Sequence, residues 1–195
     1  MNLRKVLSIS FLVLFVSLGF ESCKSKQKVS SNKEVGTILK DMPCEKDGRS
    51  DKKFFRAFAM ATSADLQLSK EKALLAAKQK LVTLIKSTTK TVTDRYINER
   101  GFGKTPEIEQ KFENITREVA NETISNIVMA CEKSSVLDDG RYRSFVAIEV
   151  DRDDVMNGMN NRLSNNQKLQ IDYDKQKFEE IFNQEMDKLK EERGY

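Results

Sequence analysis

The stretch from Phe54 to Glu99 contains neither glycine nor proline, so nothing in it forces the backbone to turn. Over residues 54–61 bulky side chains alternate with mainly small ones, and a period of two predicts a β-strand. Apolar residues then recur every three or four positions, which is typical of a helix with one buried side. We therefore expect one strand followed by one long helix, over about residues 64–98.

The start of this helix and its packing can also be predicted. Ser63 is a suitable N-cap, with Asp65 favourable in the first turn. The small side chains of the strand are mainly alanines, which let a helix approach closely, so we expect the long helix to pack on that face. The polar residues 87–91 are expected to bend the helix or to interrupt it.

The second half of the body contains a helix, a hairpin and further helices. Thr105 is expected to cap a helix that begins at Pro106 and runs to about residue 125. Residues 127–137 and 141–151 are predicted strands, and Asp138-Asp139-Gly140 forms the turn between them. Carboxylates at residues 151–154 favour the start of another helix, and residues 167–193 form a charged amphipathic helix.

This order of elements predicts an α+β fold, in which two long helices pack on a small antiparallel sheet built from a strand and a later β-hairpin. We place the domain at residues 38–162. Residues 163–195 form a C-terminal charged helix, which either docks on the domain or extends as an interaction arm.

The amino terminus has the form of a signal peptide over residues 1–22. Arg4 and Lys5 precede a fifteen-residue apolar stretch, which spans about 22 Å and is short for a bilayer core of roughly 30 Å. Cys23 follows the small residue Ser22, an arrangement that resembles the lipobox of bacterial lipoproteins, whose cysteine is acylated. The alternatives are a spanning helix, or an ordinary secretory signal with a coincidental cysteine. Residues 23–37 are polar and basic and are expected to form a flexible tether.

Composition excludes several classes of function. The chain has 195 residues and no histidine, which removes Ser-His-Asp and Cys-His nucleophiles and HExxH zinc sites. Loss of residues 1–22 removes Arg4, Lys5 and Glu21 and lowers the net charge from +4 to +3, too little to argue for nucleic acid. The acidic residues at 151–154 lack the spacing of a calcium loop. We predict no catalytic, cofactor-binding or metal-binding residues and no enzymatic activity.

With Cys23 assigned to lipid, two cysteines remain in an oxidising compartment, so we expect a disulfide between Cys44 and Cys131. In the alternative, Cys131 is a small buried core residue and Cys44 an exposed thiol. A reactive redox cysteine is disfavoured, because there is no CxxC pattern and no histidine to activate a thiolate.

Three parts of the chain together resemble one family. They are residues 55–65, the helix that carries Ala73 and Ala77, and Asp139-Gly140-Arg141-Tyr142 leading into residues 145–150. They are similar to the twenty-kilodalton outer-membrane lipoproteins of Gram-negative bacteria, in the form common in Bacteroidota, whose domain also resembles the N-terminal domain of the flagellar T protein. The match covers roughly residues 44–154. It implies an α+β domain on a lipid anchor, without cofactor or enzyme activity.

Two classes of function follow. The first is a structural or assembly lipoprotein, attached to the membrane through its lipid anchor and bound to an envelope protein partner, without nucleic acid. Surface-exported lipoproteins of Bacteroidota usually carry acidic residues after the cysteine, whereas this chain carries lysines, so the resemblance implies the periplasmic face of the outer membrane. The second is a small-ligand or cell-wall-binding lipoprotein, whose pocket residues have no recognisable signature. An enzyme of unusual chemistry is the least favoured alternative, and the sequence does not predict the oligomeric state.

Overall fold

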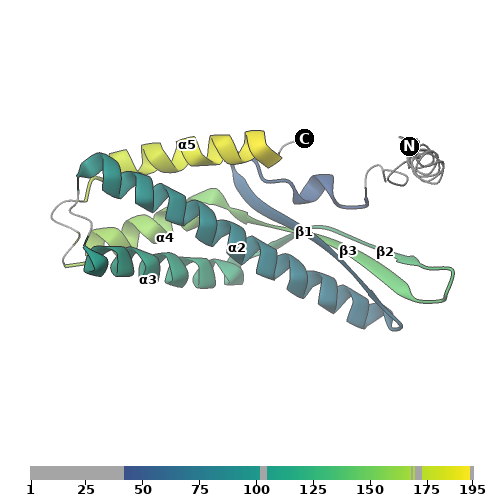
Figure 1. Ribbon diagram of the computed structural model, residues 1–195. Helices are drawn as coiled ribbons and strands as arrows, with labels where there is room; N and C mark the ends of the chain where they lie inside the picture. The colour runs from purple at the N-terminus through teal and green to yellow at the C-terminus, as the bar shows by residue number, and fades with distance from the viewer. Residues whose placement is uncertain (1–41, 102–104, 168, 170–172, 194–195) are drawn as a thin grey trace, which may run out of the picture. The chain divides into compact units, whose positions relative to one another are not determined.

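The structure is a computed structural model that describes residues 42–101, 105–167, 169 and 173–193 (Figure 1). The predicted signal peptide at 1–22 and the tether at 23–37, with Cys23, lie outside the described residues. The elements in chain order are η1 (Lys46–Gly48), β1 (Phe54–Ser63), α2 (Leu66–Arg100), α3 (Pro106–Thr123), η2 (Ile124–Asn126), β2 (Val128–Val136), β3 (Tyr142–Asp151), α4 (Arg152–Asn165) and α5 (Lys175–Arg193). The predicted α+β class is confirmed.

The three strands form one antiparallel sheet in the order β1-β3-β2. The hairpin partner β3 is the central strand, because it pairs with β2 across the turn and with β1 from Phe54↔Asp151 to Ser63↔Tyr142. A bulge at Ala130 shifts the register of β2 once, between Met129 and Cys131. The sheet therefore has two edges, β1 and β2, which differ in what lies beside them.

The long helix α2 packs on one face of the sheet (Figure 1), as the alanine face of β1 predicts. Ala57 and Ala59 are buried in the same core cluster as Ala73 and Ala77 of α2. Absence of larger side chains lets helix and strand approach closely enough for a buried hydroxyl pair, in which the oxygens of Ser69 and of its β3 partner Ser144 lie 2.6 Å apart. The strand-to-helix packing was thus predictable from side-chain size.

Two details of α2 differ from the prediction. The N-cap is Asp65, whose carboxylate accepts from the backbone N–H of Leu68 at 2.7 Å, while Ser63 ends β1 and accepts from the N–H of Asp65. The helix is also continuous through residues 87–91. Threonine hydroxyls there donate back to carbonyls one turn earlier, Thr89 to Ile85 at 2.7 Å, so the polar side chains do not compete for the helical backbone bonds.

The C-terminal half of α2 forms a helical layer with α3, α4 and α5. Thr105 caps α3 as predicted, and Asp151 caps α4. The sequence left open whether the charged C-terminal helix docks, and the structure shows that it does, with one buried stripe formed by Phe178, Ile181, Phe182, Met186 and Leu189. Burial of an apolar side chain contributes about 1.5 to 3 kcal/mol relative to an exposed one, which favours docking.

Among the described residues, no helix combines the length and the apolar composition that crossing a bilayer requires.

Candidate functional site

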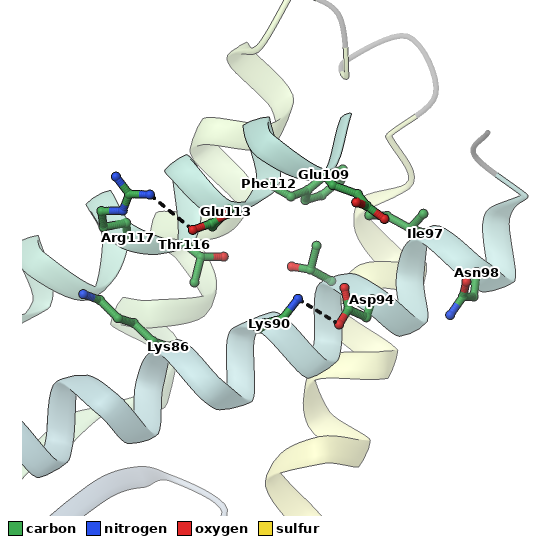
Figure 2. Close-up of a pocket in the computed structure, with 11 residues that line it drawn as sticks. Lys86, Lys90, Asp94, Ile97, Asn98, Glu109, Phe112, Glu113, Thr116 and Arg117 are labelled. Carbon is green, nitrogen blue, oxygen red and sulfur yellow. Dashed lines mark hydrogen bonds and ion pairs between the residues drawn. The ribbon is translucent and has the colours of Figure 1, made fainter. Parts of the chain in front are cut away.

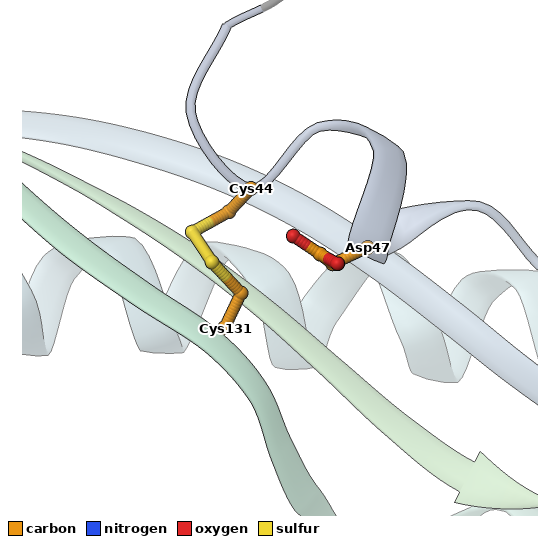
Figure 3. Close-up of side chains that lie close together, drawn as sticks. All are labelled: Cys44, Asp47 and Cys131. Atoms are coloured by element: carbon orange, nitrogen blue, oxygen red, sulfur yellow. A yellow bond between two sulfur atoms is a disulfide. The ribbon is translucent and has the colours of Figure 1, made fainter.

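The first feature of interest is the disulfide between Cys44 and Cys131 (Figure 3), whose Cα atoms lie 5.5 Å apart. Cys44 belongs to the segment before η1, and Cys131 lies on β2, 87 residues later. The buried residue is Cys44, whereas Cys131 is half-buried, so the alternative of an exposed Cys44 thiol does not hold. The pairing predicted from the cysteine count thus agrees with the structure.

The disulfide pins the η1 segment across the sheet face opposite α2. Cys44 packs there with Phe145 and Ala147 of β3 and with Phe58 of β1. The approach is close at Gly48, where a Cβ atom would lie 2.3 Å from the Cβ of Phe58. The disulfide therefore holds the η1 segment on the outer face of the sheet, and the missing side chain of Gly48 allows the close approach.

The carboxylate of Asp47 lies beside this disulfide, and its oxygen and the two sulfurs lie within 4.8 Å of one another (Figure 3). Three such atoms could hold a metal ion only if both cysteines were thiolates. In the disulfide the sulfurs are bonded to each other and carry no thiolate charge. The cluster thus has a structural role in the oxidised protein.

The outer edge of β1 is closed by neighbouring groups. Ser50 bonds to both the N–H and the carbonyl of Arg56 through its hydroxyl, at 2.8 and 3.2 Å, and the Lys80 ammonium donates to the Phe58 carbonyl at 3.0 Å. Arg56 itself is held by Asp51 at 2.5 Å and Glu149 at 2.6 Å. Burial alone would lower the pKa of Arg56, but the hydrogen bonds that its guanidinium donates to Glu149 and Asp51 raise the pKa overall, so the group stays charged. This network supports the outer edge of β1.

The outer edge of β2 has no such cover in the part of the chain that the structure describes. The backbone groups of Arg56 and Phe58 bond outward, to Ser50 and Lys80, so the even-numbered residues of β1 face away from β3. The odd-numbered residues of β1 therefore bond to the even-numbered residues of β3, and the odd-numbered residues of β3 bond toward β2. The backbone groups of Glu132, Ser134 and Val136 therefore point to the open edge. No hydrogen bond from another described residue reaches them.

The side chains of β2 are also exposed along nearly its whole length, with Cys131 alone half-buried. Val136 is 66% exposed, Val128 58% and Met129 42%. The sequence predicted the hairpin correctly, but it did not indicate which hairpin strand would be central and which would be an edge. Apolar side chains beside free backbone groups make β2 a candidate interaction surface.

A second candidate site is a groove of about 790 Å³ between the C-terminal half of α2 and α3 (Figure 2). Its residues recur every three or four positions on the facing sides of the two helices. They are Lys86, Lys90, Thr93, Asp94, Ile97 and Asn98 from α2, and Glu109, Phe112, Glu113, Thr116 and Arg117 from α3. Two ion pairs lie within it, Lys90–Asp94 at 3.2 Å and Arg117–Glu113 at 3.3 Å.

Thr93 at this groove has a buried hydroxyl oxygen without a hydrogen-bond partner in the described structure. Four other threonines of the two helices donate to the carbonyl four residues earlier, at 2.7 to 3.1 Å; they are Thr83, Thr89, Thr91 and Thr123. A buried hydroxyl without a hydrogen-bond partner lowers the stability of the fold. The unpartnered hydroxyl of Thr93 therefore distinguishes the groove from the rest of the described structure. No local pattern in the sequence distinguishes Thr93 from the other threonines of α2.

The acidic residues at the start of α4 have structural partners, as predicted. Asp151 accepts from the N–H of Asp153 at 2.7 Å, and Asp153 accepts from the guanidinium of Arg152 at 2.6 Å. Asp154 accepts from the Asn126 amide at 3.0 Å. These carboxylates cap the helix and pair with their neighbours.

Comparison of the chain with protein families, curated proteins and solved structures finds no match. The resemblance to the twenty-kilodalton lipoproteins, the acylation of Cys23 and the absence of enzymatic activity therefore stay predictions.

Proposed function

We propose that this chain is a lipid-anchored lipoprotein of the periplasmic face of the outer membrane, which has a structural or assembly role through protein–protein contacts and performs no catalysis. The observation that supports the role is the contrast between the two edges of the sheet. The β1 edge is closed by Ser50, Asp51 and Lys80, whereas the nine-residue β2 edge is open within the described residues.

An open edge strand can accept an extended segment of a partner protein as an additional strand. Backbone hydrogen bonds to Glu132, Ser134 and Val136 would supply affinity, and the exposed apolar side chains of β2 would supply contact area. Proteins normally protect such edges against unwanted pairing, and here the disulfide to Cys44 ties β2 to the segment on the outer face of the sheet. An envelope protein that contributes one strand is the partner this arrangement fits.

The proposed membrane anchor is inferred from the sequence around Cys23. Acylation of Cys23 would hold the protein at the membrane, because each buried methylene contributes about 0.8 kcal/mol and two or more acyl chains make attachment stable. We expect an acylated Cys23 at the start of the mature chain, and release or failed processing in Cys23→Ala. An intact-mass spectrum of processed protein with an unmodified Cys23 would contradict the anchor.

The assembly role is tested by chemical crosslinking in native membranes of cells that make the full-length protein. Ser134→Pro removes a backbone N–H from the open edge, and Ser134→Ala is the matched control, because both lose the hydroxyl contact to Ser144 but only proline lacks the N–H. We expect a stoichiometric partner with the wild type and Ser134→Ala, and loss of it with Ser134→Pro. The proposal fails if the partner persists with a folded Ser134→Pro, or if no protein partner is found.

A further inference from the structure

We propose that the groove between α2 and α3 binds a short linear peptide of about four residues in extended form, with its carboxylate near Lys86 and Arg117 and its amino group near Glu109. This inference is independent of the β2 edge and would hold without any assembly role.

The charges along the groove are the first argument. Its six charged side chains are three cations and three anions, so it does not favour a ligand of net charge. The charges are nevertheless separated at the ends, since Lys86 and Arg117 lie together at one end and Glu109 at the other (Figure 2). Such a groove is complementary to a zwitterion, whose opposite charges are at its two ends.

The charges that are not neutralised within the protein strengthen this argument. The ion pairs Lys90–Asp94 and Arg117–Glu113 occupy four of the six. Lys86 and Glu109 form no ion pair with another described residue, and Lys86 is half-buried. Arg117 uses one nitrogen for Glu113, which leaves other guanidinium N–H groups for a carboxylate.

The length of the ligand follows from the helix geometry. Glu109 and Arg117 lie eight residues apart on α3, which is about 12 Å along the axis. An extended chain spans about 3.3 Å per residue, so roughly four residues join the two ends. The groove volume of about 790 Å³ is also within the range of ligand-binding sites.

The floor of the groove fits a peptide backbone. Thr93 lines the groove and its buried hydroxyl has no partner in the described structure. A rotation of its side chain toward the groove would let a peptide N–H or carbonyl supply the missing bond. Thr116 offers a second hydroxyl, and Phe112 and Ile97 offer apolar contacts for small side chains. A simple inorganic anion would use the cationic end and leave the floor and Glu109 without partners.

The test is isothermal titration calorimetry of the purified full chain in detergent, with tetra-alanine as the probe. N-acetyl-tetra-alanine amide is the comparison ligand, because it has the same length without the terminal charges. We expect binding of the free peptide, and at least about tenfold weaker binding of the blocked one.

Four variants locate the site. Lys86→Gln and Glu109→Gln should each weaken binding about tenfold, and Thr93→Val should weaken it measurably. Lys72→Gln, an exposed lysine of α2 outside the groove, should bind like the wild type. The proposal is overturned by absence of binding at millimolar peptide, by equal affinity for the blocked peptide, or by unchanged affinity of a folded Lys86→Gln and Glu109→Gln.

Discussion

The guanidinium of Arg95 on α2 donates a hydrogen bond of 2.5 Å to the carboxylate of Glu185 on α5, across 90 residues of sequence. Lys188 donates to the same carboxylate at 2.9 Å. Burial alone would raise the pKa of Glu185, but the bonds from Lys188 and Arg95 lower it overall. The C-terminal helix is thus held to the long helix by a charged contact as well as by its apolar stripe.

Glu185→Gln should therefore destabilise the protein by about 1 kcal/mol at pH 7, because it keeps an acceptor and loses the charge. Since the folded-state pKa is lowered, the stabilisation is complete above about pH 4.5 and is lost as the pH falls through the folded-state pKa. Urea unfolding at pH 7 and at a pH below the folded-state pKa of Glu185 measures this. The free energies of unfolding of wild type and variant should converge at the lower pH. Glu191→Gln, an exposed neighbour on α5, is the control. A difference that persists unchanged in acid would contradict the charged contact.

Removal of the disulfide should cost about 4 to 5 kcal/mol in the chain-entropy model, because it closes a loop of 87 residues. The double variant Cys44→Ser/Cys131→Ser should show this loss in urea unfolding, and the wild type should lose a similar amount on reduction. Alkylation of the denatured, unreduced wild type should label neither cysteine. Rapid labelling of both would show that the bond is absent.

Gly48→Ala should destabilise the protein by about 2 kcal/mol, because the new methyl group meets the backbone and Cβ of Phe58 and must push the η1 segment from the sheet. The displaced segment should also make the Cys44–Cys131 bond faster to reduce. Both effects can be measured, by thermal unfolding and by the rate of thiol release with a small reductant. Asp47→Ala changes an exposed side chain in the same turn and is the control for thermal unfolding, which it should leave unchanged.

Thr93→Val should raise the free energy of unfolding by up to about 1 kcal/mol, because it replaces a buried hydroxyl without a partner by a methyl group of the same shape. Thr89→Val is the matched control on the same helix. Its hydroxyl donates to the Ile85 carbonyl at 2.7 Å, so its loss should lower stability by a similar amount. Equal destabilisation by both variants would mean that Thr93 has a partner.

Local signals predicted most of the elements correctly. Thr105 before Pro106 set the start of α3, and Asp138-Asp139-Gly140 set the hairpin turn, because capping and turn formation depend on residues a few positions apart. The choice between Ser63 and Asp65 as the cap of α2 was wrong. Both residue types are good caps, but Ser63 is still paired with Tyr142 in the sheet, so Asp65 is the one that can cap the helix.

The candidate sites were less predictable, because each depends on contacts between distant segments. The open edge of β2 exists because β3 pairs with β1, and no local pattern indicates which hairpin strand becomes central. The α2–α3 groove likewise needs Lys86 and Arg117 to lie together, although 31 residues separate them. Its threonines were visible in the sequence, but only helix packing shows that the hydroxyl of Thr93 is buried without a partner.

The sequence by itself determined the order and type of most of the elements and their amphipathic faces, because these follow from side-chain period and turn chemistry. It predicted the pairing of Cys44 with Cys131 only on the assumption that Cys23 carries lipid. The tertiary structure decided which sheet edge is open, that α5 docks through Phe178 and Phe182, and where a polar groove forms. Those outcomes depend on which apolar faces become buried against one another, and this is defined only when all of the elements are packed together.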